Sequence, residues 1–351
     1  MLQKIWPSML KSTEPAFTFA LKSVTPVTSV KQRTKIKLTN NPSDIGTFSG
    51  TIPMIMKIGI VIKPHQTQFE TPLKELLAWL GDHHCEAIVE DVVVEAFALT
   101  QMTGTKFEAI PDQSDVIIAF GGDGTMLRVA RAIRDASPLR LVPILGVNLG
   151  SLGFLTEISL KDLYPALTHV LEDNYAVGRR NMLKVLIHRG DNAQTNRERG
   201  PSEVYHALND VVVNSGALAR LINMDAFVDE DYIATFPADG MIISTPTGST
   251  AYSLSAGGPV LYPKLNSVVM TPICSHTLTN RPLVIPAESN IRVVVRSGEE
   301  IMLTVDGQIG VPLEAGDEVC CTKSETQIAL IQTGQTDFFD VLREKLKWGE
   351  R

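Results

Sequence analysis

A short apolar run that leads directly into a glycine turn constrains this chain more than any other feature. Residues 116–120 are all apolar, residues 121–125 read Gly-Gly-Asp-Gly-Thr, and residues 126–136 space their apolar side chains with helical periodicity. This order predicts a buried strand, a tight turn and a helix. Such a turn suits phosphate, because free backbone N–H groups and the positive end of the helix dipole face the same place.

Asp123 is the unusual residue of this turn. A carboxylate repels phosphate unless a metal ion or a hydroxyl group lies between them. The glycines, in contrast, let the backbone approach an anion closely. The combination favours phosphoryl transfer over simple phosphate binding. The residues that we expect to bind phosphate are Gly121, Gly122, Gly124 and Thr125.

The first half of the chain alternates strand-like and helix-like segments, which predicts a parallel sheet with ligands at the carboxyl ends of its strands. A second glycine-rich turn, residues 147–154, follows one of these strands and is expected at the same edge. The predicted strands are 56–62, 87–94, 116–120 and 142–146, and the predicted helices are 72–82, 125–136 and 160–171.

Beyond Val177 the segments become short, β-branched and free of intervening helices, which predicts a mostly antiparallel β domain. Residues 337–348 regain helical spacing and are expected to pack back on a domain. The predicted strands are 182–188, 205–214, 221–228, 241–244, 291–295 and 301–305, with a polar loop at 191–202.

The predicted fold class is therefore α/β plus all-β. A Rossmann-like α/β domain would comprise residues 56–178 and 335–351, and an antiparallel, sandwich-like β domain would comprise residues 179–334. Residues 1–53 carry seven Lys and Arg against two acids, and they show no periodicity. We expect a disordered extension or a misplaced translation start there rather than a transit signal. Transit signals are rich in arginine, and Arg33 is the only arginine among residues 1–53.

Charge, hydropathy and cysteine content narrow the functional classes. The net charge is −7, and residues 1–53 carry an excess of five positive charges, so the remainder carries −12. This acidity argues against a nucleic-acid partner. No apolar run reaches the ~18 residues that a membrane helix needs. The four cysteines have no C-x-x-C spacing, which predicts reduced thiols, a cytoplasmic protein and no protein-built metal site.

Two further stretches carry binding chemistry. Residues 239–258 run from a strand into a loop rich in hydroxyl groups and glycine, which suits ribose and amide edges, and Tyr252 offers a flat face for a base. The alternative is a serine-rich connecting loop. Asn209-Asp210 opens an apolar strand and could bind a base amide and a sugar hydroxyl, or form only a turn.

Competing nucleotide motifs are missing from the sequence. It contains no P-loop G-x-x-x-x-G-K-[ST], no H-R-D and D-F-G set of protein kinases, and no G-x-G-x-x-G fingerprint. A P-loop enzyme, a protein kinase and a Rossmann hydride-transfer enzyme are therefore disfavoured.

Taken together, the three stretches resemble the NAD kinase family, which phosphorylates NAD to NADP. The matching segments are 121–125, Asn209-Asp210 and 239–258, and the resemblance extends from residue 56 to residue 348. The first segment is shared with diacylglycerol-type lipid kinases and phosphofructokinases. The run Thr-Pro-Thr-Gly-Ser-Thr-Ala-Tyr at 245–252 is much more specific.

The resemblance implies that Asp123 is catalytic and acts on the 2′-hydroxyl of the adenosine ribose. It also implies ATP with Mg²⁺ or another divalent metal as donor, with polyphosphate as an alternative donor, and a homodimer or homotetramer. The positions that the resemblance assigns to NAD are Asp123, Gly124, Arg128, Asn209, Asp210, Arg220, Asp239, Thr250, Ala251, Tyr252, Ser253, Leu254, Ser255 and Gln308. Arg128 and Arg220 could equally be solvated surface residues.

Two departures from the family pattern stand out. Asp210 lies where relatives more often carry Glu, so its contact with the ligand would be lost or bridged by water. Pro237 lies where a side chain often influences the choice of phosphate donor. Two other functions stay open at this point: a non-catalytic NAD(P)-binding sensor, and a lipid or sugar kinase that shares only the glycine-aspartate turn.

Overall fold

The computed structural model describes residues 55–63, 69–136, 140–150, 153–190, 200–216, 221–275, 279–334 and 337–348. The expectations for residues 1–53, for Arg220 and for most of the loop 191–202 lie outside these ranges. Within them, no helix has the length and apolar character needed to cross a membrane.

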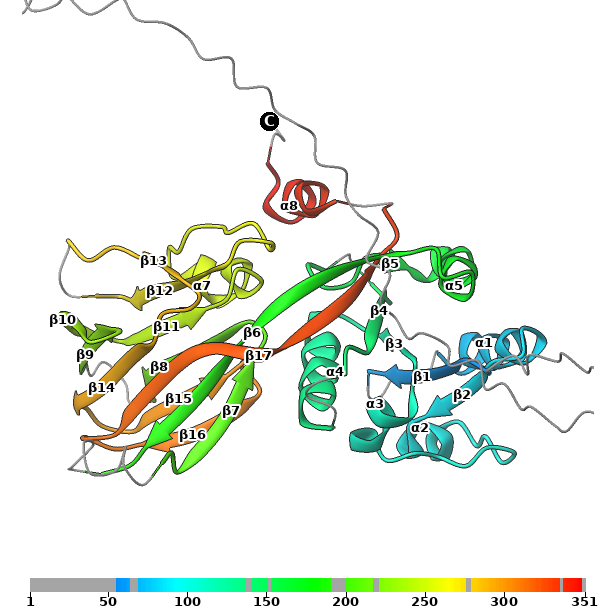
Figure 1. The fold of residues 1–351 in the computed structure, drawn as a ribbon, viewed down its shortest axis with the longest axis horizontal. Coiled ribbons are helices and arrows are strands. Elements are labelled where there is room, and N and C mark those ends of the chain that lie inside the picture. Colours follow the sequence, from blue (N-terminus) through cyan, green and yellow to red (C-terminus); the bar gives the residue numbers. More distant parts are fainter. Residues whose placement is uncertain are drawn as a thin grey trace, which may run out of the picture. The chain divides into compact units, whose positions relative to one another are not determined.

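The first part of the chain is a parallel sheet between helices (Figure 1). Its strands are β1 (Lys57–Ile62), β2 (Glu86–Val89), β3 (Val116–Phe120), β4 (Pro143–Asn148) and β5 (Ile158–Ser159). Its helices are α1 (Glu70–Asp82), α2 (Asp91–Ala96), α3 (Ile110–Gln113), α4 (Asp123–Ala136) and α5 (Leu163–Leu171), with 3-10 turns η2 (Phe107–Ala109) and η3 (Leu160–Asp162).

Both faces of this sheet are covered, which explains why its strands are apolar throughout. Ile118 and Phe120 of β3 point into one core with side chains of α1 and α5. Ile117 and Ala119 point to the opposite face, where α3 and α4 pack. The alternation along β3 follows the two-residue period of a strand. The predicted α/β domain is therefore confirmed.

The expected strand 87–94 is wrong in its second half, because β2 ends at Val89 and α2 begins at Asp91. Tertiary contacts override the β-branched composition of Val92-Val93-Val94. The backbone of Thr105 bonds both Val89 and Asp91, which closes the strand, and the Asp91 side chain accepts from Val92 N at the start of the helix.

The second part contains two packed sheets, so the expected sandwich is confirmed. One is antiparallel with the order β13-β12-β11-β8-β15-β16. The other contains β10, β9, β14, β17, β6 and β7 and continues into the parallel sheet. The bounds are β6 (Ala176–His188), β7 (Glu203–Ala207), β8 (Asp210–Ser215), β9 (Ile222–Val228), β10 (Asp231–Ala238), β11 (Gly240–Ser244), β12 (Ser267–Ile273), β13 (Leu283–Pro286), β14 (Ile291–Ser297), β15 (Ile301–Val305), β16 (Ile309–Leu313) and β17 (Glu318–Gln332).

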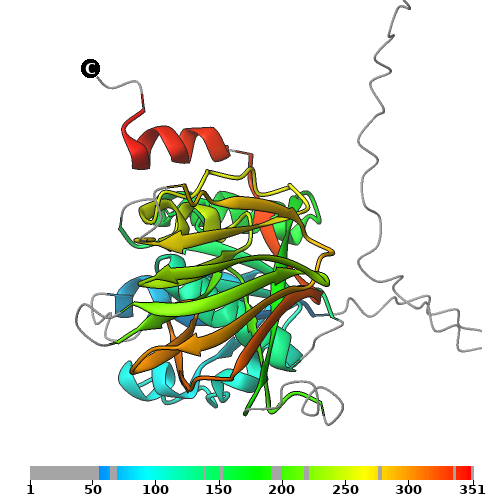
Figure 2. The ribbon, with the colours of Figure 1, turned by 90° about the vertical axis from the view of Figure 1, so that its left-hand side faces the viewer.

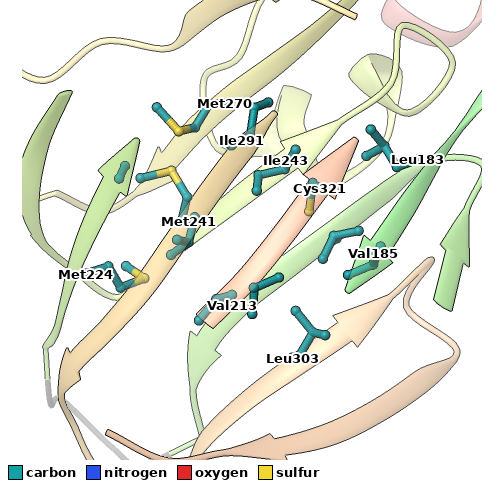
Figure 3. Close-up of a cluster of buried hydrophobic side chains, with 14 of the residues drawn as sticks. Leu183, Val185, Val213, Met224, Met241, Ile243, Met270, Ile291, Leu303 and Cys321 are labelled. Atoms are coloured by element: carbon teal, nitrogen blue, oxygen red, sulfur yellow. The ribbon is translucent and has the colours of Figure 1, made fainter. Parts of the chain in front are cut away.

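Side chains from the facing surfaces of the two sheets form one core (Figure 3). Val213, Met241 and Leu303 enter it from the six-stranded sheet, and Val185 and Met224 enter it from the other sheet. The expected strand 205–214 is in fact two strands, β7 and β8, that belong to different sheets. The chain changes sheet at Leu208-Asn209, so the Asn-Asp pair lies at a corner.

Two long strands join the parts. β17 pairs antiparallel with β6 along most of its length and pairs parallel with β4 at Ala329 and Leu330. Hydrogen bonding is therefore continuous from β10 to β2. The proposed domain boundary between residues 178 and 179 falls inside β6.

The C-terminal helix α8 (Phe338–Leu346) forms as expected. Asp337 and Asp340 make a reciprocal capping box at its start. The Phe338 ring lies 6.4 Å from Phe154 of the first domain and 5.4 Å from Tyr262 of the second. The helix therefore returns to the first domain and also contacts the second. Figure 2 faces the β strands, with α8 in red.

Burial of Phe120, at the end of the strand that leads into the glycine turn, should contribute strongly to the stability of the fold. Phe120 is 0% exposed, so Phe120→Ala is expected to lower the free energy of unfolding by about 3–5 kcal/mol through lost burial and a cavity. Phe339→Ala is the matched control, because Phe339 is 52% exposed and its loss should cost less than about 1 kcal/mol. Chemical denaturation measures both, and equal losses would contradict this assignment of the core.

Candidate active site

The glycine turn joins β3 to α4 with little room for side chains. A Cβ on Gly121 would lie 2.2 Å from Thr125 Oγ1, so only glycine fits there. The N–H groups of Thr125 and Met126 both donate to the Gly122 carbonyl, at 2.9 and 3.3 Å, which closes the first helical turn. A Cβ on Gly122 would meet nothing within 4 Å, so one side of the turn is open.

The Asp123 carboxylate is fixed by the second glycine-rich turn. Its Oδ2 accepts from Phe154 N at 3.1 Å, and its Oδ1 accepts from Leu155 N at 2.9 Å. A Cβ on Gly153 would lie 2.2 Å from Oδ1, so the close approach requires glycine at that position. Two charge-assisted hydrogen bonds stabilise the carboxylate and leave each oxygen a further lone pair for a ligand.

Two polar residues that the sequence did not single out support the second turn. Asn148 Oδ1 accepts from Gly150 N at 2.7 Å, and Asn148 Nδ2 donates to Thr156 Oγ1 at 3.3 Å. Thr156 Oγ1 also accepts from Gly153 N at 3.0 Å. Asn148 at the end of an apolar strand, two residues before a glycine, is a signal that would have identified it.

Asp306 holds the Asn209-Asp210 corner and was also missed. Its carboxylate accepts from Leu208 N at 2.9 Å, Asn209 N at 2.7 Å and Asp210 N at 3.2 Å. Asp306 lies between β15 and β16 in a left-handed conformation, with φ of 51°. Burial raises the pKa of this carboxyl group, and the three N–H donors oppose that rise.

Asp210 links the same corner to the hydroxyl-rich loop. Its carboxyl group is 5% exposed and accepts from the Tyr252 backbone N–H. Burial, and then the charge of Asp306, raise the pKa of Asp210 to about 7. Among the described residues, none hydrogen-bonds the Asn209 side-chain amide, so that amide is available to a ligand.

Most hydroxyl groups of the loop 244–253 are consumed internally. Thr245 Oγ1 donates to Leu208 O at 2.6 Å, and Ser253 Oγ bonds Thr271 Oγ1 at 3.0 Å. Ser249 is fully buried and bonds Pro246 and Leu261. Thr245 and Ser244, whose hydroxyl donates to Asn209 O, support the corner at Asn209, whereas Ser249 and Ser253 hold the loop itself. The turn η4 (Gly248–Thr250) and the short helix α7 (Tyr252–Ser255) leave Tyr252, which is 46% exposed, as the main open surface.

Gln308 links the β domain to the glycine turn. Its Nε2 donates to the Gly124 carbonyl at 3.0 Å, and its Oε1 accepts from Arg131 Nη2 at 2.9 Å. The same β15–β16 turn therefore contacts the corner at Asn209 through Asp306 and the start of α4 through Gln308.

Two of the predicted ligand residues that the structure describes, Arg128 and Asp239, are not drawn into this group. Arg128 forms an ion pair with the buried Glu90, and its guanidinium lies 3.6 Å from the centre of the Phe107 ring, beside a hollow of about 430 Å³ along α4. Asp239 precedes β11 at the end opposite Ser244, about 17 Å away at ~3.3 Å per residue. Arg220 lies outside the described residues. The ligand roles of these three stay predictions.

The buried Asp210 should make stability depend on pH. Its native pKa of about 7 lies above its ordinary value of 3.8, so the native state retains a proton that the unfolded chain has released between these values. The stabilisation is present below about pH 4 and is lost as pH rises to about 7. Asp210→Asn should remove this dependence, so its stability relative to the wild type rises across the window. Urea unfolding at a series of pH values measures the difference, and a constant difference would contradict the assignment.

The comparisons with known proteins agree on one family. A family model of the ATP-NAD kinase N-terminal domain matches residues 58–175, and one of the ATP-NAD kinase C-terminal domain matches residues 208–333. The NAD kinase of Geotalea daltonii is 46% identical over 296 residues, which cover 84% of this chain and 99% of that protein. The NAD kinase of Trichlorobacter lovleyi is 44% identical over 299 residues, with the same two shares.

Solved structures show the same fold. The crystal structure of yeast NADH kinase complexed with NADH has a TM-score of 0.74 at 27% identity, covering 85% of this chain and 89% of that chain. The structure of an NAD kinase from Archaeoglobus fulgidus in complex with ATP has a TM-score of 0.62 at 26% identity, covering 83% and 99%. With both domains matched and relatives aligned over nearly their whole length, the chain belongs to the NAD kinase family.

Proposed function

We propose that this chain is an NAD kinase, which transfers the terminal phosphoryl group of ATP to the 2′-hydroxyl of the adenosine ribose of NAD and so makes NADP. One observation carries the proposal for the site. The Asp123 carboxylate, held by Phe154 N and Leu155 N, begins a helix whose Gly124 is tied by Gln308 to the turn that supports Asn209. A phosphate-compatible turn and a nucleoside-compatible corner are thereby joined.

Asp123 would accept a hydrogen bond from the ribose 2′-hydroxyl and orient that oxygen toward the phosphorus. Catalysis of phosphoryl transfer depends mainly on positioning and on charge stabilisation, so a carboxylate need not be a strong base to serve here. The two N–H donors fix the direction of the carboxylate before substrate binds. Orientation of the acceptor is therefore its main role.

The dinucleotide would lie against the corner and α7. The free amide of Asn209 suits the amide or base edges of NAD, and the exposed Tyr252 ring suits stacking. The buried Asp210 and Ser253 would act by holding α7 rather than by direct contact. The remaining proposed contacts come from Gly124, Thr250, Ala251, Leu254 and Ser255.

Donor phosphates would meet the backbone N–H groups of Gly122 and Gly124. The N–H groups of the other two predicted phosphate-binding residues, Gly121 and Thr125, already donate to Val147 O and Gly122 O. In the described part of the chain, no group of three His, Cys, Asp or Glu side chains could hold a metal ion. Mg²⁺ bound to ATP needs no such cage, because it prefers phosphate oxygens and water with one or two carboxylates. We therefore propose Mg²⁺ as part of the donor, with Asp123 as the nearest carboxylate of the turn.

We further propose that the protein works in the cytoplasm as a homo-oligomer. All four cysteines are free thiols, as a reducing compartment favours. Exposed apolar side chains, Tyr232 on β10 and Val284 on β13, lie on strands at the edges of the two sheets, and such edges favour pairing with another chain.

Formation of NADP from NAD and Mg-ATP tests the function. NADP is detected with an NADP-specific dehydrogenase, and the assay is repeated with polyphosphate as donor and with NADH as acceptor. We expect NADP from NAD and ATP with wild-type protein. A lack of product under every combination would contradict the proposal and would favour a binding-only role.

Replacement of the central acid tests its role. Asp123→Asn should lower kcat by at least about a hundredfold, the usual contribution of a positioned acid–base group, because the amide is a far weaker acceptor for the 2′-hydroxyl. The dissociation constant for NAD, measured by calorimetry, should change less than about threefold. A loss of NAD affinity in step with the loss of kcat would show that Asp123 binds rather than orients.

A further inference from the structure

A relay of two side-chain hydrogen bonds runs from the middle of α4 back to its first turn. Arg131 Nη2 donates to Gln308 Oε1 at 2.9 Å, and Gln308 Nε2 donates to Gly124 O at 3.0 Å. Arginine has donors only, so the atom of the amide that faces Arg131 must be the oxygen. The nitrogen is then left to face the Gly124 carbonyl. Arg131 thus fixes the orientation of the Gln308 amide.

The relay lies at a sensitive place. Gly124 is the neighbour of Asp123, so a shift of the Gly124 carbonyl moves the start of α4 and the carboxylate with it. The opposite end of the same β15–β16 turn is Asp306, which holds the backbone of Asn209. A turn of three residues therefore contacts both the start of α4 and the Asn209 corner.

We propose that Arg131 is a positioning residue for phosphoryl transfer, acting through Gln308 on the carbonyl group of Gly124, the residue that follows Asp123. The inference rests on the proposed kinase function. It assigns a role to an arginine that none of the sequence motifs includes, and it makes Gln308 a tie between elements, since both ends of its amide are engaged by the protein. Substrate placement to within about 1 Å governs such reactions, which is why a tie of this kind matters.

The competing explanation is a surface hydrogen bond without consequence for the reaction. Exposed polar contacts contribute little to stability, so a change in stability cannot decide the question. A loss of kcat with KM unchanged can decide it. Removing one hydrogen bond to a charged group corresponds to about a tenfold effect where that bond matters for the transition state.

The first experiment compares Arg131→Met, Arg131→Lys and the control Arg296→Met. Arg296 is an arginine on β14 with one side-chain partner, Asp225. We expect Arg131→Met to lower kcat about tenfold, with KM for NAD and ATP changed less than about twofold. Arg131→Lys should restore most of kcat, because lysine can also donate to Oε1. Arg296→Met should match the wild type, and equal rates for all three variants would overturn the proposal.

A double-mutant cycle separates positioning from direct contact with substrate. If Arg131 acts through Gln308, adding Arg131→Met to Gln308→Ala should lower kcat no further. Multiplied losses would show that Arg131 acts by a route other than Gln308, either on the substrate or through its charge on Asp306, and would overturn the proposal. Gln308→Glu sharpens the test. Its carboxylate pairs with Arg131 but cannot donate to Gly124, so kcat should fall about tenfold while the melting temperature is unchanged or higher.

Hydrogen–deuterium exchange gives a readout that is independent of turnover. Peptides that cover residues 121–128 should exchange faster in Arg131→Met and Gln308→Ala than in the wild type, and Arg296→Met should leave them unchanged. Unchanged exchange in both variants would overturn the tie. If the wild type made no NADP, the proposed function would fail, whereas the exchange data would still decide whether Arg131 and Gln308 hold the turn.

Discussion

The site depends on one contact, the hydrogen bonding of the Asp123 carboxylate by the N–H groups of Phe154 and Leu155. This contact joins the ends of two adjacent parallel strands, β3 and β4, through their glycine-rich turns. It explains why a phosphate-compatible turn tolerates an acid, since the negative charge is stabilised by the protein itself. It also explains Gly153, because a side chain there would collide with the carboxylate. The first turn is thus usable only in the presence of the second.

One short turn links the β domain to this unit in addition to the long strands β6 and β17. Asp306 binds three consecutive backbone N–H groups at the corner between β7 and β8, and Gln308 binds the Gly124 carbonyl. Buried hydroxyl groups hold the corner from its other side, among them that of Thr245. Asp123, which we propose to be catalytic, and the predicted nucleoside surface therefore belong to one hydrogen-bonded network, although they are far apart in the sequence.

Sequence reasoning predicted β3 and α4, whose environment is uniform along their length, but it missed the buried strand β12 and the long strand β17. β3 is apolar because both faces are covered, and α4 shows its buried stripe. The strand predicted at residues 92–94 was wrong, because backbone hydrogen bonds with Thr105 end β2 before these β-branched residues. Asp306 escaped notice because its importance lies in partners almost a hundred residues away. The hydroxyl-rich loop was located correctly, but composition could not separate the buried hydroxyl groups that support the chain from the exposed surface at Tyr252.

We expect the Asp123 carboxylate, already oriented by the second turn, to face the acceptor hydroxyl. A crystal structure of the protein with NAD measures this directly, as the distance between the nearer Asp123 carboxylate oxygen and the 2′-oxygen of the adenosine ribose. This distance should be that of a hydrogen bond, about 2.6–3.2 Å, with both bonds to Phe154 N and Leu155 N retained. A separation beyond about 5 Å, too long for a hydrogen bond or one bridging water, would contradict it, as would a carboxylate that had left the second turn.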